Sequence, residues 1–375
     1  MKIIYISEYF PYENEGEITG GVEARCLNIA KRLSKKNDIT IITSWKTGQE
    51  RRHKIGKINI LRVGQHHKYT NEGNFTSRLK FSIAAYKTAK KLKADIIEGY
   101  NFISYLPAYY AGKKINAKKI ATYHEVWQGE WIKNKGLIGV VGELWEKWTL
   151  SLKWDKIISV SKFTANKLMK NNIPKNKISV IYNGINLKDY TSKEKKYKNP
   201  TIISISRLTP KKRVDDLIKA IYLVKKQIPN IKLIIIGKGN ELKNLQELVS
   251  KYRLQENVHF TGYVKDYADV IKMLKKSHIF CLPSILEGFG IVLTEAMAAK
   301  TPYICSDITV LKEVSQNQKG GLIFKQKNYK DLTNKILFLL KNKKLYAQKE
   351  KECEAIAKKY DWDKISKQVF EVYNK

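Results

Sequence analysis

The sequence predicts an α/β protein built from two Rossmann-like domains joined by a hinge. Short apolar runs rich in β-branched residues alternate with amphipathic helical stretches, which is typical of parallel, doubly wound sheets. The alternation stops between Leu187 and Pro200, where the chain is polar and lysine-rich, and then it starts again. With 375 residues the chain is too long for one compact core and suits two domains.

The predicted strands are apolar throughout rather than alternating, as expected for strands that helices cover on both faces. The domains that follow from this pattern are residues 1–187 and 188–358, with a final helix in 359–375. Earlier helices are expected at about 21–36 and 76–92. The runs that predict strands are KIIYI, DITIIT, INILRV, ADIIE, KKIATY, DKIISV and KISVIY in the first domain and TIISIS, IKLIIIG, NVHFTG, HIFCLP and PYICS in the second.

The net charge of +36 is extreme and has two explanations. One is attraction to a polyanion or to an anionic membrane surface. The other is a coding bias toward lysine, because lysine far outnumbers the nine arginines. The excess is divided evenly about Leu187, with a net charge of +18 on each side, so no basic tail carries it.

The cysteines and the apolar runs indicate a cytoplasmic location. The four cysteines form no CxxC pair, which favours reduced packing residues. The N-terminal apolar run of about five residues is shorter than the roughly 7–15 of a signal peptide. No stretch approaches the roughly 18 uncharged residues of a membrane span, so we expect any membrane contact to be peripheral.

Two segments of the second half place chemistry directly after predicted strands, where Rossmann-like sheets bind ligands. Arg207 and Lys212 follow one strand and precede a helix, as an anion-binding pair does; a solvated pair at a helix start is the alternative. Further along, Phe289, Gly290 and Ile291 stand where a glycine turn becomes a helix. Their backbone N–H groups are expected to hold a phosphate or sugar hydroxyls.

Two glutamates flank that turn, and two further candidates lie in the first half. Glu287 and Glu295 are expected to accept hydrogen bonds from sugar hydroxyls, with a helix cap and a helix surface residue as the alternatives. The Gly20-Gly21 pair follows the first strand and opens a helix, where free N–H groups favour an anion. His124 follows another strand, where it can donate to a hydroxyl; a structural histidine is the alternative.

Taken together, these segments resemble the retaining glycosyltransferases of family 4, which have the GT-B fold. The resemblance rests on motifs in the family's order over nearly the whole chain, of which the Glu-x7-Glu element is the most specific. It implies an acceptor-binding first domain facing a nucleotide-sugar-binding second domain across a cleft. It also implies that residues 359–375 cross back onto the first domain. The matching motifs are GGVE, TYHE, SVSKFT, VIYNGIN, SRLTPKK, IIIGKGNE, VHFTGYV and EGFGIVLTEAMAAKTP.

The resemblance also implies a role for each matching residue. Arg207 and Lys212 would neutralise the donor diphosphate, so that no metal and no cofactor is needed. Glu287 and His124 would contact the donor sugar near the reacting carbon, and Glu295 would hold the ribose hydroxyls. The expected catalytic residues are Glu287, His124, Arg207 and Lys212. The donor-binding set would further contain Gly20, Gly21, Gly237, Val264, Phe289, Gly290, Ile291 and Val292, and the residue following IIIGKG and the Tyr263-Val264 stretch would lie near the base.

Some positions depart from the family pattern or from a metal-site pattern. Arg213 and Lys300 stand where the family usually has glycine or a small residue, and Arg213 either adds charge near the phosphates or starts a helix. The Asp361-Trp362-Asp363 sequence is interpreted as a helix start rather than a metal site. The pair His66-His67 has no partner at metal-ligand spacing and is interpreted as part of a loop.

The stretch 126–155 holds five of the seven tryptophans together with lysines and a short apolar patch. Trp and Lys suit a membrane interface, whereas a core helix is the alternative. The predicted partners are a nucleotide-sugar donor, a glycan, lipid-linked or glycolipid acceptor, and an anionic membrane, and nucleic acid is not expected as a partner. An epimerase of similar fold and a non-enzymatic polyanion-binding protein are the alternative functions; a phosphorylase is disfavoured by the length and by the lack of a pyridoxal-lysine context.

Overall fold

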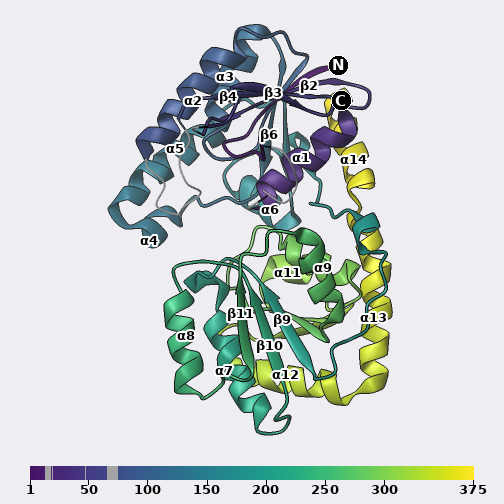
Figure 1. Cartoon of the computed structure of the whole chain (residues 1–375). Helices are drawn as coiled ribbons and strands as arrows, with labels where there is room; N and C mark the ends of the chain where they lie inside the picture. Colours follow the sequence, from purple (N-terminus) through teal and green to yellow (C-terminus); the bar gives the residue numbers. More distant parts are fainter. Residues whose placement is uncertain (13–17, 19, 47, 66–74) are drawn as a thin grey trace. The chain divides into compact units, whose positions relative to one another are not determined.

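The computed structural model describes residues 1–12, 18, 20–46, 48–65 and 75–375 (Figure 1). The chain forms two compact units. Unit 1 comprises Met1–Asn183 together with Trp362–Lys375, and unit 2 comprises Gly184–Asp361. The boundary predicted after Leu187 lies within four residues of this division. Within the described parts of the chain, no helix combines the length and the apolar composition needed to cross a bilayer.

Unit 1 is built on an eight-stranded sheet with the order β3-β4-β2-β1-β5-β6-β7-β8. All neighbours are parallel except β3 and β4, which form an antiparallel edge hairpin. Strand β3 was not predicted because three of its four residues are polar and alternate residues are exposed. The strands are β1 (Lys2–Ile6), β2 (Asp38–Ser44), β3 (Arg52–Ile55), β4 (Ile58–Val63), β5 (Ile96–Gly99), β6 (Lys118–Tyr123), β7 (Lys156–Ser159) and β8 (Ile178–Val180).

Helices cover both faces of this sheet, which explains why its strands are apolar on both sides (Figure 1). One face packs against α1 (Gly21–Leu33) and α14 (Trp362–Asn374). The opposite face packs against α2 (Phe75–Ala89), α3 (Tyr105–Ile115), α5 (Gly139–Ser151) and α6 (Lys162–Lys170). The short α4 (Trp131–Lys135) and the 3-10 turn η2 (Gly136–Ile138) lead into α5.

The C-terminal helix α14 is anchored in unit 1 by polar contacts as well as by its apolar face. The Tyr373 hydroxyl hydrogen-bonds to the buried Glu98 carboxylate and, at 3.0 Å, to the Tyr5 hydroxyl. Arg32 of α1 pairs with Asp363 at 2.6 Å. Lys118 donates to the last carbonyls of α14 at 3.0 and 3.1 Å, which is where a cation stabilises a helix end.

Unit 2 contains a fully parallel six-stranded sheet with the order β11-β10-β9-β12-β13-β14. Five of the six strands coincide with predicted runs, whereas β14 was missed because its glycine start and four residues give too short a pattern. The strands are β9 (Thr201–Ile205), β10 (Lys232–Ile236), β11 (Val258–Gly262), β12 (Ile279–Leu282), β13 (Tyr303–Ser306) and β14 (Gly321–Phe324).

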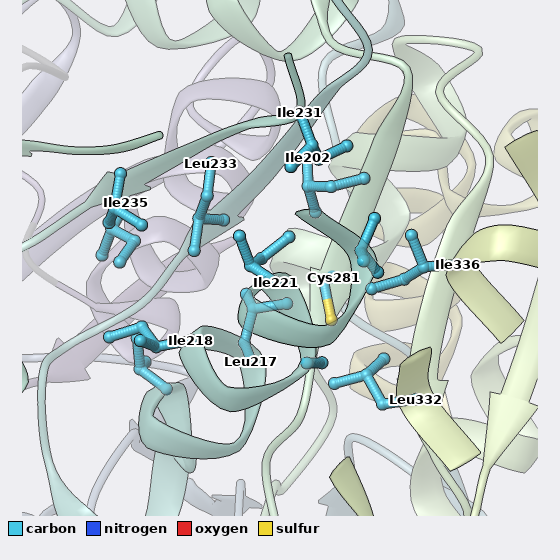
Figure 2. Close-up of a cluster of buried hydrophobic side chains, with 14 of the residues drawn as sticks. Ile202, Leu217, Ile218, Ile221, Ile231, Leu233, Ile235, Cys281, Leu332 and Ile336 are labelled. Carbon is cyan, nitrogen blue, oxygen red and sulfur yellow. The ribbon is translucent and has the colours of Figure 1, made fainter. Parts of the chain in front are cut away.

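The core of unit 2 lies between this sheet and helices on one face, where Ile202, Leu217 and Ile336 meet (Figure 2). On that face lie α7 (Val214–Lys225), α8 (Leu242–Lys251) and α12 (Tyr329–Lys341). The remaining helices are α9 (Tyr267–Lys276), α10 (Ile291–Ala298), α11 (Thr309–Val314) and α13 (Lys343–Ala357), with the short turns η4 (Leu187–Tyr190), η5 (Pro210–Lys212) and η6 (Lys358–Tyr360). Helices α10 and α13 pack against each other.

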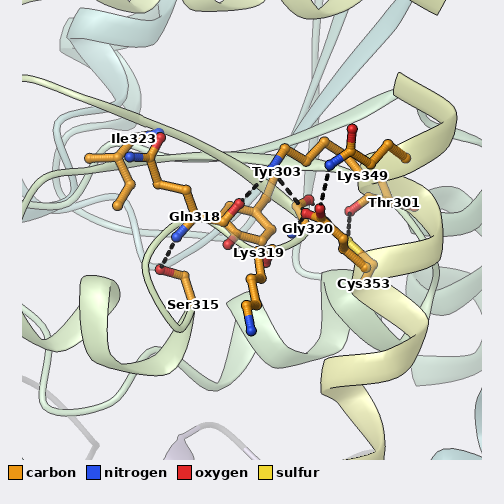
Figure 3. A network of polar contacts seen from close by, with 11 residues as sticks. Thr301, Tyr303, Ser315, Gln318, Lys319, Gly320, Ile323, Lys349 and Cys353 are labelled. Carbon is orange, nitrogen blue, oxygen red and sulfur yellow. Dashed lines mark hydrogen bonds and ion pairs between the residues drawn. The ribbon is translucent and has the colours of Figure 1, made fainter. Parts of the chain in front are cut away.

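The loop before β14 is held in an unusual conformation by α13 (Figure 3). Three consecutive residues, 316–318, and then Gly320 have positive φ angles. Lys349 donates to the Gln318 carbonyl at 2.8 Å, and Gly320 donates its N–H to Glu352 at 2.8 Å. The Cys353 thiol donates to the Gly320 carbonyl at 3.1 Å. The loop is therefore fixed to the helix through its backbone.

Candidate active site

Unit 2 carries most of the predicted site at the carboxyl edge of its sheet. The strand order reverses between β9 and β12, and α/β sheets bind ligands at such a switch point. Arg207 and Lys212 follow β9, whereas the glycine turn with Glu287 follows β12. Because neighbouring parallel strands end at the same edge, the fold brings these two segments together, as the sequence analysis expected.

Lys212 and Glu287 form an ion pair across the switch point. The Lys212 Nζ lies 2.6 Å from Glu287 Oε1, and the two side chains are only 19% and 11% exposed. The backbone supports the contact, since Ile285 donates its N–H to the Lys211 carbonyl at 2.9 Å. A cation and a carboxylate held in a largely water-excluded position can each be redirected to a ligand that offers phosphates and hydroxyls.

Arg207 is exposed at the same edge, on a loop whose backbone is pressed against the loop after β10. A Cβ at Gly237 would lie 1.9 Å from the Ser206 carbonyl oxygen, and Gly237 has a φ of +138°. A Cβ at Gly239 would lie 2.0 Å from the Leu208 carbonyl oxygen. The structure thus explains Gly237 by the close approach of two loops that position Arg207; its contact with a nucleotide stays a prediction.

The turn before α10 combines a buried side chain with backbone N–H groups at a helix start. The Phe289 ring is buried and lies edge-on to Tyr360, with 5.8 Å between ring centroids. Gly290 has a φ of +85°, and a Cβ there would lie 2.9 Å from the Leu311 side chain. Gly290, Ile291 and Val292 therefore present backbone N–H groups at the start of a helix, where an anion is favoured.

Glu295 lies further along α10, among tyrosines rather than cations. Its carboxyl group is hydrogen-bonded by Tyr267, whose hydroxyl also interacts with Tyr190. Burial of the carboxyl raises its pKa to about 7, with the Tyr267 hydrogen bond acting in the opposite direction. Part of the Glu295 surface remains exposed. The sequence analysis identified the carboxylate but missed both tyrosines, which come from distant segments.

The positions that depart from the family pattern have local explanations. Arg213 adopts a left-handed conformation before α7 and forms two hydrogen bonds with Asp216, at 2.8 and 2.7 Å. It is therefore a helix-start residue. Lys300 is also left-handed after α10 and pairs with Glu354 at 2.9 Å. Val264 follows β11 at the same edge and is half-buried.

Unit 1 holds the other predicted residues at the carboxyl edge of its own sheet. Gly20 precedes α1 with an extended backbone, and Gly21 is the first and exposed residue of that helix. His124 follows β6, and its Nε2 has no hydrogen-bond partner among the described residues. Burial and the nearby charge of Arg25 lower its pKa to about 3, so the imidazole is neutral.

Arg25, two residues after the GGVE motif, was not among the predicted site residues. It is fully buried in α1 and donates through Nη1 to the carbonyls of Ile181 and Tyr182 and to Asn183 Oδ1, at 3.1, 2.8 and 3.0 Å. These residues end the N-terminal segment of unit 1 and lie within the quoted VIYNGIN motif. Asn183 of that motif therefore anchors the chain where this segment leaves the unit.

A polar group at the switch point of unit 1 was also missed. The strand order reverses between β1 and β5. Glu8 follows β1, is buried, and accepts hydrogen bonds from Arg78 at 3.0 Å and from Asn101 at 3.1 Å. Asn101 follows β5, while Arg78 comes from α2. The clue in the sequence is an acidic residue directly after the first strand of a basic chain.

Two further predictions concern residues outside this set. Asp361 pairs with Ile185 in an isolated parallel bridge, and Asp363 pairs with Arg32. Asp361 is the last residue of unit 2, and Asp363 lies in the first turn of α14, which fits the interpretation of a helix start. The pair His66-His67 lies outside the described residues.

Comparison with known proteins assigns both halves of the chain. Residues 19–189 match the family described as "Glycosyltransferase Family 4", and residues 188–360 match "Glycosyl transferases group 1". An uncharacterised glycosyltransferase of Methanocaldococcus jannaschii is 30% identical over 381 residues, which cover 100% of this chain and 98% of the relative.

A second relative and a solved structure extend this comparison. The N,N'-diacetylbacillosaminyl-diphospho-undecaprenol alpha-1,3-N-acetylgalactosaminyltransferase of Campylobacter jejuni is 29% identical over 60% of this chain and 62% of the relative. The structure of sucrose-phosphate synthase from Thermosynechococcus elongatus superposes with a TM-score of 0.84 at 19% identity, covering 100% of this chain and 98% of that one. This likeness confirms the predicted GT-B fold.

Proposed function

Because the chain belongs to glycosyltransferase family 4, we propose that it moves a sugar from a nucleotide-diphosphate sugar to a glycan or lipid-linked acceptor. Transfer retains the anomeric configuration and needs no metal ion. The observation that carries this proposal is the ion pair between Lys212 and Glu287 at the switch point of unit 2, beside helix-start amides. Such an edge offers cations to phosphates and a carboxylate to sugar hydroxyls.

In this proposal the donor replaces the ion pair. Lys212 turns from Glu287 to the diphosphate, and Arg207 adds a second positive charge. Glu287 then accepts hydrogen bonds from the donor sugar, while the amides of Gly290 and Ile291 hold phosphate or sugar oxygens. Lys212 and Arg207 together stabilise the negative charge that develops on the leaving diphosphate, as a metal ion does in other transferases.

The bond changes balance without a further reactant. The bond between the anomeric carbon and the diphosphate oxygen breaks, and a bond from the acceptor oxygen to that carbon forms on the same face. The acceptor proton passes to the leaving diphosphate oxygen. Glu287 and the neutral His124 are proposed as sugar contacts rather than as bases, and Glu295 as the contact for the ribose hydroxyls.

A lipid-linked acceptor is proposed on two grounds. The Campylobacter jejuni relative is named for an undecaprenol-linked acceptor. In unit 1, Asn101 hydrogen-bonds to Glu8 at the switch point, while the next residue, Phe102, packs on Trp131 and Trp145. A site for hydroxyl groups therefore adjoins an aromatic surface suited to an apolar portion of the acceptor.

The proposal is tested with Glu287→Gln and Lys212→Met in the full chain. A thermal-shift screen of UDP, GDP and their sugars identifies the donor, since a ligand at about 100 times its Kd stabilises by about 2.7 kcal/mol. We expect Lys212→Met to abolish that stabilisation. We expect Glu287→Gln to keep diphosphate binding and to lower donor turnover about 100-fold, the typical effect of removing one transition-state contact.

The matched control is Glu247→Gln, an exposed glutamate on α8. Glu247→Gln should bind and turn over donor as the unchanged chain does. EDTA should not change the turnover rate of the unchanged chain or of any variant. Wild-type turnover by Glu287→Gln would refute the assignment of the site. Release of an epimerised sugar nucleotide instead of a transferred sugar would refute the proposed reaction.

A further inference from the structure

Glu146 of α5 is a buried carboxylate that the proposed reaction does not use. Its residue is only 3% exposed, and two N–H groups converge on its oxygens. The Trp127 backbone donates to Oε1 at 3.0 Å and to Oε2 at 3.1 Å, while the Trp131 indole donates to Oε2 at 2.8 Å. Because both oxygens accept from N–H groups, an ionised carboxylate satisfies this arrangement best.

These hydrogen bonds hold the loop of residues 124–130, which leads from β6 to α4. Two neighbouring backbone groups of the loop are bound by two different helices. Lys167 of α6 donates to the Val126 carbonyl at 3.0 Å, and the next N–H, that of Trp127, is bound by Glu146 of α5. The loop is therefore held by its backbone, with a buried charged group on one side.

His124 begins this loop, and its position depends on the loop backbone. Its Nε2 has no hydrogen-bond partner among the described residues, so no bond at that atom fixes the imidazole. Its carbonyl accepts a bond of 3.4 Å from the Thr164 hydroxyl, and three residues later Trp127 is bound by Glu146. A displacement of about 1 Å near a reacting centre can cost about 100-fold in rate. A change at Glu146 is therefore expected to matter at His124, the proposed donor-sugar contact.

Glu146 also orients Trp131, the first residue of α4. The Trp131 ring lies 4.8 Å from the Phe102 ring and 5.3 Å from the Trp127 ring, measured between centroids. Phe102 and Trp131 belong to the surface proposed for an apolar portion of the acceptor. One buried carboxylate thus supports residues proposed to contact the donor and residues proposed to contact the acceptor.

We propose that Glu146 is a positioning residue for sugar transfer, whose carboxylate fixes the loop after β6 and acts through His124 and Trp131. The inference rests on the proposed function, because that function assigns His124 to the donor sugar and Trp131 to the acceptor surface. It adds a residue that none of the sequence motifs indicated. It also predicts that the rate of transfer depends on the charge of Glu146.

The surroundings of Glu146 place its change of charge near neutral pH. Burial, together with the negative charge of Glu143, raises its pKa to about 7, while the two N–H donors and the Lys167 ammonium act in the opposite direction. Tyr105 of α3 and Tyr123 of β6 also face it, and burial raises the pKa of both hydroxyls, so they stay neutral. Below about pH 7 a proton on one oxygen removes an acceptor from the converging N–H groups. The loop is expected to be held best above that pH.

Nuclear magnetic resonance of the full chain tests this anchor without any turnover. The seven tryptophans are replaced by 5-fluorotryptophan, and the ¹⁹F resonance of Trp131 is assigned with Trp131→Phe. We expect the Trp131 resonance to shift with pH with a midpoint near 7 in the unchanged chain, and not to shift in Glu146→Gln. A resonance that does not shift in the unchanged chain, or that shifts equally in Glu146→Gln, would overturn the anchor.

Kinetics with the donor identified by the thermal-shift screen test the link to transfer. At pH 8 and saturating donor, Glu146→Gln should lower kcat by about 10–100-fold and change the KM for the donor by less than about threefold. The difference should narrow toward pH 6, where the unchanged chain is itself protonated at Glu146. Saturating donor keeps the proposed effect of Glu295 on binding out of this comparison.

Two further variants separate charge from shape. Glu146→Asp keeps the charge and should retain more of kcat and of its pH dependence than Glu146→Gln, which keeps the size. A higher kcat in Glu146→Gln would show that the side chain only fills space and would overturn the proposal. The matched control is Glu130→Gln, which changes an exposed glutamate of the same segment and should leave kcat and its pH dependence unchanged.

The failure of this inference is distinguishable from the failure of the proposed function. Unchanged kcat and pH dependence in Glu146→Gln, with Glu287→Gln still impaired, would overturn the positioning role alone. No transfer by the unchanged chain would refute the proposed function and this role with it. Far-UV circular dichroism checks that each variant folds. If Glu146→Gln does not fold, the Trp131 titration of the unchanged chain and the rates of Glu146→Asp decide the question.

Discussion

Glu295 is the carboxylate whose environment most clearly links the site to pH. Burial raises its pKa to about 7, so it is largely protonated below that pH although an ordinary carboxyl group is not. The fold is therefore more stable at low pH as far as this group is concerned, and that contribution is lost as pH rises through about 7. An ionised Glu295 is the better acceptor for hydroxyl groups.

We predict that affinity for the nucleoside diphosphate that stabilises the chain increases as pH rises from 6 to 8. Glu295→Gln should make this dependence weaker than in the unchanged chain, because a glutamine does not titrate, whereas the terminal phosphate of the ligand titrates with both proteins. Isothermal titration calorimetry at several pH values measures the difference. His124 does not contribute to it, since its pKa of about 3 keeps it neutral throughout. The same pH dependence in Glu295→Gln and in the unchanged chain would contradict the assignment.

At the residue scale the sequence predicted which candidate residues lie together where they share one segment; their roles stay predictions. Glu287 and the amides of Gly290 and Ile291 follow from a strand, a turn and a helix in succession. The supporting residues could not be predicted, because they depend on contacts between distant segments. Tyr267 reaches Glu295, and Arg25 reaches residues 181–183, only after the sheets have formed.

At the scale of elements, the loop before β14 shows how a backbone conformation is fixed by a neighbouring helix. Gly320 has a φ of +88°, and a Cβ there would lie 2.8 Å from Cys353 Sγ and 3.2 Å from the Cys353 backbone. Glycine is thus required for two separate reasons, conformation and space.

We predict that Gly320→Ala lowers the stability of unit 2 by about 2–3 kcal/mol, because backbone strain and overpacking add. Gly48→Ala provides the matched control: Gly48 has a φ of +85°, but among the described residues no atom lies within 4 Å of the new Cβ. It should cost only the strain, about 1 kcal/mol. Urea unfolding measures both, and equal losses would show that the contact with α13 is unimportant.

The elements that the sequence predicted are those with a long, uniform apolar pattern. Strands such as β1 and β10 meet this condition, and their positions agree with the predicted runs to within two residues. The edge strand β3 is mostly polar because one side faces water, and β14 begins with Gly321, directly after the left-handed Gly320. Neither pattern differs from that of a loop until the partner strand is known.

At the scale of the molecule, the sequence predicted two Rossmann-like domains but not how the chain's ends are used. Unit 1 is assembled from both ends of the sequence, since α14 packs on its sheet. The hydrogen bond between Tyr373 and Glu98 joins residues that lie 275 positions apart. Unit 1 therefore completes its core only when the last helix has been made.

Each unit contains buried cysteine thiols, whose chemical labelling can report when that unit unfolds. Cys26 belongs to unit 1, whereas the other three belong to unit 2, and all four are fully buried. Burial also raises the pKa of each thiol, which keeps it in the unreactive protonated form. The thiols of unit 2 are Cys281, Cys305 and Cys353.

We predict that a maleimide labels none of them in the native chain within minutes. Increasing urea should expose Cys26 and the three unit 2 thiols in two separate transitions, read by mass spectrometry of peptides. Gly320→Ala should shift only the second transition, and rapid labelling without urea would contradict the burial. The rate at which each unit's cysteines are labelled therefore reports how often the core of that unit opens.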